Sequence, residues 1–150
     1  MNNSMPGGSA SPVRSKMDSF SRFLGVAIVE WQPDYAVLEL EIDRETHVNR
    51  SGILHGGVLM TLIDTACGYA GTYCDVPGEV RRASTLSLTT SFVAPVSGGK
   101  VRAVGHRKGG GRKIFFASAE VFSEGGVLLG FGEGSFRYRG DSAGSRRAPD

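Results

Sequence analysis

The chain has 150 residues, of which 22 are glycine, with a hydrophobic fraction of 40% and a formal net charge of +2 at pH 7. This length indicates one domain with a modest core, and the many glycines favour a turn-rich fold that contains strands. The sequence has no apolar run of the ~18 residues that a membrane-spanning helix needs, and its first residues lack the basic start and apolar stretch of a secretory signal.

The two ends of the chain are predicted to be unstructured. Residues 1–12 are rich in Asn, Ser, Gly and Pro, and residues 140–150 have a similar composition. Such segments bury too little apolar surface to fold. We therefore expect a folded domain over residues 13–139, which begins with a short amphipathic helix over residues 13–23.

Two strands and one long helix are predicted next. Residues 25–31 form the first strand, and residues 35–42 alternate apolar and acidic side chains, which is typical of a half-buried strand. After a polar connection, residues 56–73 predict a helix that is apolar nearly all round. We expect this helix to be buried on most of its sides.

Both cysteines fall in the predicted helix region, Cys67 inside it and Cys74 at its end. Seven residues at 1.5 Å each separate them by roughly 10 Å, which is too far for a disulfide. This favours a reduced, cytoplasmic protein. Small apolar neighbours indicate that the cysteines pack in the core rather than act as nucleophiles.

Four further strands are predicted after the helix, at residues 84–94, 100–106, 113–122 and 127–138. A tight glycine turn at 109–111 and a hairpin turn at 124–126 separate the later ones. Leu86, Leu88 and Phe92 alternate with Thr and Ser, so we expect these three on one face of their strand. The whole is an α+β fold in which an antiparallel sheet of about six strands, the last four in a meander, wraps round one helix.

The most informative feature for function is a lone acid, Asp64, behind a His-Gly-Gly turn. Asp64 is the one carboxylate between residues 46 and 74, and most of its neighbours are apolar. An ionised carboxylate is costly to place in such surroundings. His55, Gly56 and Gly57 mark the predicted helix start, where backbone N–H groups lack intrahelical partners and carry partial positive charge. A carboxylate and a set of backbone donors are two parts of a hydrolytic site.

Basic residues gather in residues 80–119, a segment that holds no acid. A nucleic-acid surface is one interpretation, but the segment lacks the interleaved aromatic residues of a single-strand binder. A small polyphosphate ligand is a second interpretation, and a solvated basic rim of the sheet is a third.

These motifs resemble the hotdog-fold acyl-CoA thioesterases of the 4-hydroxybenzoyl-CoA thioesterase superfamily, and within them the PaaI-type (phenylacetate-pathway) group. The resemblance covers residues 20–139. It rests on the strand order and on these pieces: Asn49-x-x-Gly52-x-x-His55-Gly56-Gly57, Leu62-Ile63-Asp64-Thr65-Ala66, Phe92-Val93-Ala94-Pro95, Gly111-Arg112 and Gly134. It implies hydrolysis of an acyl- or aryl-CoA thioester, homodimers whose sheets join edge to edge with active sites at the interface, and pairing of dimers into homotetramers.

The resemblance implies a catalytic set. Asp64 would act as general base on water or as nucleophile on the thioester, and the Gly56 N–H would donate to the oxyanion. His55 would bind the substrate carbonyl or fix the loop, Asn49 would orient the water or the acid, and Thr85 would bond the carboxylate or the water. Each also has an ordinary interpretation as a helix cap, a turn residue or a strand residue.

The basic segment gains a use under this resemblance, because CoA carries a diphosphate and a 3′-phosphate. The residues predicted to contact CoA or substrate are Gly57, Arg81, Arg82, Arg107, Lys108, Gly111, Arg112 and Lys113. The residues predicted to line an acyl pocket are Met60, Tyr69, Tyr73 and Phe92. CoA is part of the substrate, so no cofactor is expected, and the spacing of the histidines does not suggest a metal site.

Two other functions are compatible with the same fold. One is a module that binds or senses CoA esters without turnover, although a buried acid beside the thioester would then have no use. The other is a hotdog dehydratase, whose His–Asp or His–Glu arrangement is missing from this chain.

Helix geometry separates the two predicted catalytic groups. Asp64 follows Gly56 by eight residues, which is about 12 Å along one helix. One helix therefore does not bring both groups to the same carbonyl. We expect a site shared across a two-fold axis, with Gly56 from one chain and Asp64 from the other.

Overall fold

The computed structural model describes residues 17–140. The expected leader (1–12), most of the expected tail and the first part of the predicted 13–23 helix lie outside these residues. Helix α1 spans Ser19–Leu24, with Asp18 as its N-cap and Gly25 (φ 86°) as its C-cap. Within residues 17–140, no helix combines the length and apolarity that crossing a membrane requires.

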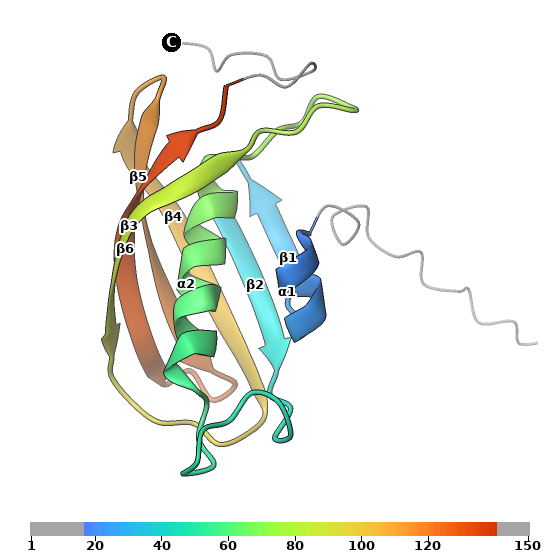
Figure 1. The fold of residues 1–150 in the computed structure, drawn as a ribbon, viewed down its shortest axis with the longest axis vertical. Helices are drawn as coiled ribbons and strands as arrows, with labels where there is room; N and C mark the ends of the chain where they lie inside the picture. Colours follow the sequence, from blue (N-terminus) through green and yellow to red (C-terminus); the bar gives the residue numbers. More distant parts are fainter. Residues whose placement is uncertain (1–16, 141–150) are drawn as a thin grey trace, which may run out of the picture.

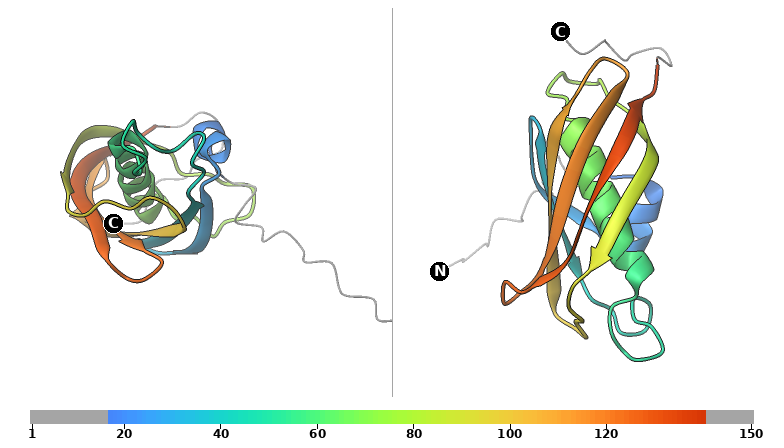
Figure 2. Two further views of the ribbon diagram at one scale, coloured as in Figure 1. Left: turned by 90° about the horizontal axis from the view of Figure 1, so that it is seen from below. Right: turned by 90° about the vertical axis from the view of Figure 1, so that its left-hand side faces the viewer.

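The remaining elements are β1 (Ala27–Gln32), β2 (Tyr35–Glu41), α2 (Gly56–Gly71), β3 (Ala83–Phe92), β4 (Lys100–Gly110), β5 (Ile114–Ser123) and β6 (Leu128–Tyr138). The six strands form one antiparallel sheet in the order β1-β2-β4-β5-β6-β3. Figures 1 and 2 show this sheet curving around α2, with α1 beside β1. The predicted α+β fold, a six-stranded sheet around one long helix, is confirmed.

The predicted four-strand meander is wrong for β3. Strands β4, β5 and β6 do form a meander, but β3 pairs with β6 and not with β4. The connection through residues 93–99 runs below α2 in Figure 1 and carries the chain across to β4. Alternation along a sequence identifies a strand and its buried face, but it does not identify the neighbouring strand. The consequence is that β3 and β1 are the two edges of the sheet.

The predicted turn at 109–111 begins later than expected. Strand β4 continues to Gly110, with an irregularity in its pairing to β5 between Arg107 and Gly109. Gly110 has a φ of 136°, and a Cβ there would lie 2.4 Å from the carbonyl oxygen of Ile114. Only glycine fits this approach, so the glycines serve a bent strand end as well as a turn.

The expectation that α2 is buried on most of its sides is wrong. Its buried residues are Val58, Leu59, Leu62, Ile63, Ala66, Cys67, Ala70 and Gly71, which face the sheet. The opposite stripe, with Thr61, Asp64, Thr65 and Gly68, stays half-buried. These side chains are small or polar, and they remain partly accessible to solvent. The stripe leaves Asp64 accessible.

A bulge in β3 changes which side chains face the helix. The pairing of β3 with β6 is irregular between Thr85 and Ser87, and the intervening Leu86 is 53% exposed. The prediction that Leu86 shares a face with Leu88 and Phe92 is therefore wrong, because a bulge shifts the alternation by one residue. Leu88 packs against the core.

Candidate active site

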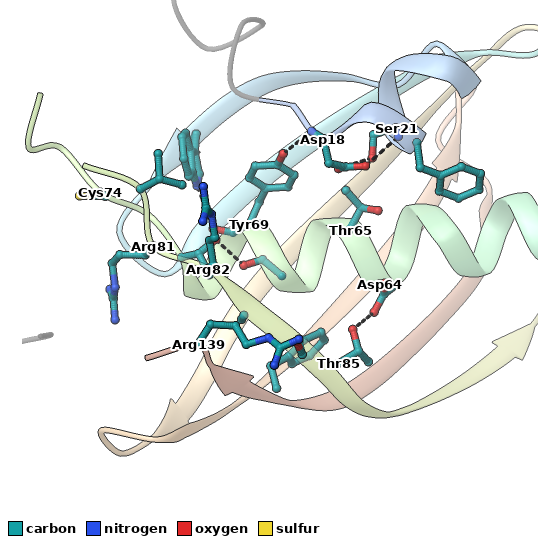
Figure 3. Close-up of a pocket in the computed structure, with 18 of the residues that line it drawn as sticks. Asp18, Ser21, Asp64, Thr65, Tyr69, Cys74, Arg81, Arg82, Thr85 and Arg139 are labelled. Atoms are coloured by element: carbon teal, nitrogen blue, oxygen red, sulfur yellow. Dashed lines mark hydrogen bonds between the residues drawn. The ribbon is translucent and has the colours of Figure 1, made fainter. Parts of the chain in front are cut away.

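Asp64 and Thr85 lie together on the open side of α2. The Thr85 hydroxyl donates to Asp64 Oδ1 at 2.6 Å, as Figure 3 shows. Asp64 Oδ2 has no hydrogen-bond partner among residues 17–140. The pair comes from the middle of the helix and from the bulged start of β3. The arrangement holds one carboxylate oxygen in place and leaves the other available.

Both residues line a pocket of about 860 Å³ between α1 and the start of β3 (Figure 3). Its floor is the half-buried stripe of α2, from Thr61 to Gly68. The wall nearest α1 carries three aromatic side chains, Phe20, Trp31 and Tyr69. The pocket therefore joins an acid to an aromatic surface.

Three contacts of Trp31 and Tyr69 join this aromatic wall to α2 and to the start of α1. Trp31 and Tyr69 pack edge to face, with ring centroids 5.4 Å apart. The Trp31 indole N–H donates to the Tyr69 carbonyl at 2.8 Å, and the Tyr69 hydroxyl accepts from the Asp18 backbone N–H at 3.2 Å. Burial raises the pKa of Tyr69, which keeps its hydroxyl protonated. These contacts tie α1 and β1 to α2 around the pocket.

The residues predicted to line an acyl pocket are only partly brought together. Tyr69 lines the large pocket, whereas Phe92 lines a different one. Met60 is 39% exposed, and Tyr73 packs edge-on against Trp31. Sequence reasoning missed Phe20 and Trp31, because they precede Asp64 by more than thirty residues and reach the pocket only through α1 and the pairing of β1 with β2.

A basic wall stands on the β3 side of the same pocket. Arg81 and Arg82, both predicted, line it together with Arg139. The Arg81 guanidinium lies over the Tyr138 ring at 4.6 Å, and the Arg139 N–H donates to the Arg82 carbonyl at 2.8 Å. Arg139 was missed, since only the pairing of β3 with β6 brings residue 139 beside residue 82.

The other predicted CoA residues do not line this pocket. They are Gly57, in the first turn of α2, and Arg107, Lys108, Gly111, Arg112 and Lys113, at the end of β4 and in the following turn. Arg107 lies 3.7 Å from the Asp34 carboxylate in the β1–β2 turn. The Lys113 carbonyl accepts from the Tyr138 N–H at 2.9 Å, so the turn lies at the same end of the molecule as Arg81.

The start of α2 forms a second, smaller pocket of about 360 Å³. Gly56, Asn49 and Phe92 line it, and a Cβ on Gly56 would lie 3.1 Å from Phe92 Cε1. His55 is the N-cap, and its Nδ1 accepts from the Gly57 N–H at 2.8 Å. The Gly56 N–H has no acceptor in residues 17–140. Gly56 therefore offers a free donor, while Gly57 does not.

Asn49 and His47 shape the loop that leads to this pocket. The Asn49 side-chain oxygen accepts from the Ser51 N–H at 2.9 Å and the Ile53 N–H at 3.3 Å. His47 is buried, and its Nδ1 accepts from the Asp43 N–H at 2.9 Å. The His47 carbonyl accepts from the His55 N–H at 2.8 Å. Within one chain, Asn49 thus orders its own loop and does not contact Asp64.

The cysteines form no disulfide. Burial, and then the nearby negative charge of Asp64, raise the pKa of the Cys67 thiol to about 12. A thiol that stays protonated is a poor nucleophile. The packing role predicted for Cys67 agrees with this environment, whereas Cys74 lies beyond the end of α2 and lines the large pocket.

The two parts of a hydrolytic site occupy separate pockets in one chain. The carboxylate lies in the large pocket, and the free Gly56 donor lies in the small one, about 12 Å away along α2. A carboxylate with an available oxygen can activate water or attack a carbonyl, and an unpaired N–H at a helix start can stabilise an oxyanion. One chain alone does not direct both groups at one carbonyl.

Comparison with known proteins finds relatives of this chain in both sequence and fold. Residues 51–129 match the family model described as thioesterase superfamily. A protein of Saccharolobus solfataricus described as an esterase is 33% identical over 82 residues, which are 54% of this chain and 55% of that protein. The chain thus matches about half the length of this relative. Mouse acyl-coenzyme A thioesterase 13 is 28% identical over 110 residues, which are 73% of this chain and 76% of that protein.

Solved structures of other proteins have a similar fold. A conserved protein from Pseudomonas aeruginosa superposes with a TM-score of 0.72 and 27% identity, over 82% of this chain and 95% of that chain. A mutant of the phenylacetic acid degradation protein PaaI from Thermus thermophilus superposes with a TM-score of 0.68 and 29% identity, over 80% of this chain and 98% of that chain.

Proposed function

This chain belongs to the thioesterase superfamily, and from that premise we propose that it hydrolyses an acyl- or aryl-CoA thioester to the carboxylate and free CoA. The observation that carries the proposal is the Thr85–Asp64 pair, with one free carboxylate oxygen facing a large pocket. Family membership supports thioester chemistry in general. The pocket supports Asp64 and Thr85 as the residues at which that chemistry takes place.

Asp64 has the same free oxygen, Oδ2, for either chemical route. As general base, it takes a proton from water while the water oxygen attacks the thioester carbonyl carbon. As nucleophile, it attacks that carbon itself, and water then cleaves the resulting anhydride. In both routes the carbon–sulfur bond breaks and CoA leaves as its thiolate. Thr85 keeps Oδ1 occupied and so directs Oδ2 at the substrate.

The oxyanion formed in either route needs a donor from a second chain. We assign that role to the Gly56 N–H, which lies in a different pocket from Asp64 of its own chain. A homodimer in which Gly56 of one copy meets Asp64 of the other completes the site. The exposed edge strand β3 supports such a dimer, since an unpaired edge is normally covered or paired, and dimers would pair further into tetramers.

The basic wall fits the phosphates of CoA. Arg81, Arg82 and Arg139 lie in the same pocket as Asp64. Arginine binds phosphate oxygens through paired, charge-assisted hydrogen bonds. Arg112 and Lys113, at the same end of the molecule, would extend this surface towards the nucleotide.

The test is hydrolysis of a panel of acyl- and aryl-CoA esters, with the released thiol detected. Asp64→Asn keeps the shape of the side chain and removes its charge, so we expect the rate to fall by about 10²–10⁴-fold. Glu41→Gln, at an exposed strand end, is the matched control and should keep full activity. If the wild-type protein binds CoA esters but hydrolyses none, it is a binding module and the proposal is wrong.

A further inference from the structure

Helix α2 contains two glycines near its C-terminal end, Gly68 and Gly71, and their surroundings differ. A Cβ on Gly71 would lie 2.1 Å from Phe115 Cε2, so packing against the sheet requires glycine there. A Cβ on Gly68 would meet no atom within 4 Å. Packing therefore does not explain Gly68.

Gly68 is also unfavourable for the helix itself. Glycine in a helix interior loses more backbone freedom on folding than any other residue, and alanine would be better. Gly68 has no left-handed φ that would require glycine. A glycine that weakens its helix and is not required by packing is explained if a ligand occupies the space that a side chain would fill.

The space above Gly68 belongs to the pocket that holds Asp64. Gly68 lines it, four residues or about 6 Å along the helix from the carboxylate. Its neighbour Tyr69, together with Trp31, forms the aromatic wall on one side. This distance suits a ring attached to a carbonyl held at Asp64. Aromatic side chains offer such a ring edge-to-face contacts.

We propose that Gly68 is a specificity-determining residue, whose missing side chain makes room for an aryl acyl group on the floor of the pocket. The inference rests on the proposed thioesterase function and deepens it by naming the substrate class. The thioester carbonyl lies at Asp64, the ring lies over Gly68 against Trp31 and Tyr69, and CoA leaves the pocket along the arginine wall.

The test is a size series at one position, with Gly68→Ala and Gly68→Leu assayed on benzoyl-CoA and acetyl-CoA. For benzoyl-CoA we expect kcat/KM to fall about 10-fold in the alanine variant and on the order of 100-fold in the leucine variant. For acetyl-CoA both variants should stay within about two-fold of wild type, because the small acyl group does not reach Gly68. The midpoint of thermal unfolding should rise for Gly68→Ala.

Gly98→Ala is the matched control. Gly98 also has no atom within 4 Å of a built Cβ, and it lies in a loop outside the pocket. This variant should leave kcat/KM unchanged for both esters. It separates the effect of filling the pocket from the general effect of replacing glycine by alanine.

Three results would overturn the proposal. Equal losses for both esters, or weaker binding of free CoA, would place the pantetheine arm above Gly68 instead of the acyl group. A changed oligomeric mass would make Gly68 a subunit contact. Unchanged selectivity would leave the space above Gly68 without a role.

A separate measurement keeps this proposal distinct from the proposed function. Binding of non-hydrolysable thioether analogues of the two esters is measured by calorimetry for the same variants. If the wild-type protein hydrolyses nothing, a loss of affinity confined to the aryl analogue still supports the role of Gly68. Equal affinities across the series contradict it.

Discussion

At the scale of single residues, the Thr85–Asp64 hydrogen bond is the contact on which the proposed site rests. The two residues are 21 positions apart, and they meet because the bulge after Thr85 alters the facing of β3. Hydrogen bonds from a hydroxyl to a carboxylate are short and strong, and this one measures 2.6 Å. In the proposed function this hydrogen bond positions the carboxylate and does not itself react.

Replacing Thr85 tests that positioning role. Thr85→Val keeps the shape and removes the hydroxyl, so we expect kcat to fall by about 10-fold while KM changes little, in line with the loss of one hydrogen bond to a charged group. Thr85→Ser keeps a hydroxyl and should retain most of the wild-type kcat. Steady-state kinetics on one ester give both constants. Normal turnover by the valine variant would show that the hydrogen bond is dispensable.

The sequence predicts some of these residues better than others. Asp64 stands out as a lone acid in an apolar helix, and its match to a known motif extends to Thr85. Leu86 was misplaced because a bulge of one residue leaves no mark in an alternating pattern. Phe20, Trp31 and Arg139 carry no local signal, since each enters the pocket only through the packing of distant segments.

At the scale of elements, one face of α2 packs against the sheet and the opposite face lines the proposed site. The face towards the sheet is apolar, and glycines allow close approach: a Cβ on Gly105 of β4 would lie 2.4 Å from the Ala66 carbonyl oxygen. The opposite face is small and polar and forms the pocket floor. The sequence revealed the helix and its length, but its many apolar residues concealed the open stripe.

The raised pKa of the Cys67 thiol, on the packed face of α2, makes the stability of the protein depend on pH. The folded protein keeps this thiol protonated up to a pKa of about 12, whereas the unfolded chain ionises it near the reference value of 9.0. At pH values between these two pKa values, unfolding therefore releases a proton. The free energy of unfolding falls as pH rises, by up to about 1.4 kcal/mol per pH unit.

The measurement is denaturant unfolding of wild type and Cys67→Ala at a series of pH values. Below pH 9 the wild type should be the more stable, because alanine leaves a small void. Above pH 9 that advantage should shrink, since only the wild type contains the thiol. An advantage that stays constant up to pH 10 would show that the Cys67 thiol titrates normally.

At the scale of the whole molecule, the order of strands places the site. Because β3 pairs with β6, it becomes an edge, and its start with Thr85 borders the pocket. Sequence patterns predicted six strands and their approximate bounds, yet the position of β3 depends on long-range pairing that no local pattern encodes. The rise of α2 separates Gly56 from Asp64 by about 12 Å within one chain, which makes a shared site between two chains the central claim.

The helix start offers a precise way to remove the proposed oxyanion donor. Proline lacks the N–H and is well tolerated at the first position of a helix. His55, which precedes Gly56, has φ −62° and ψ 134°, and this extended conformation is compatible with a following proline. Gly56→Pro therefore removes the donor, and Gly56→Ala is the control that adds a Cβ near Phe92 but keeps the N–H.

The most direct measurement is the activity recovered when inactive Gly56→Pro and Asp64→Asn chains are unfolded, mixed in equal amounts and refolded together. If each site takes Gly56 from one chain and Asp64 from the other, every mixed dimer contains one intact site. Random pairing then restores about a quarter of the wild-type thioesterase activity. If mass spectrometry shows mixed dimers but no thioester is hydrolysed, the site is not shared between chains and the account is wrong.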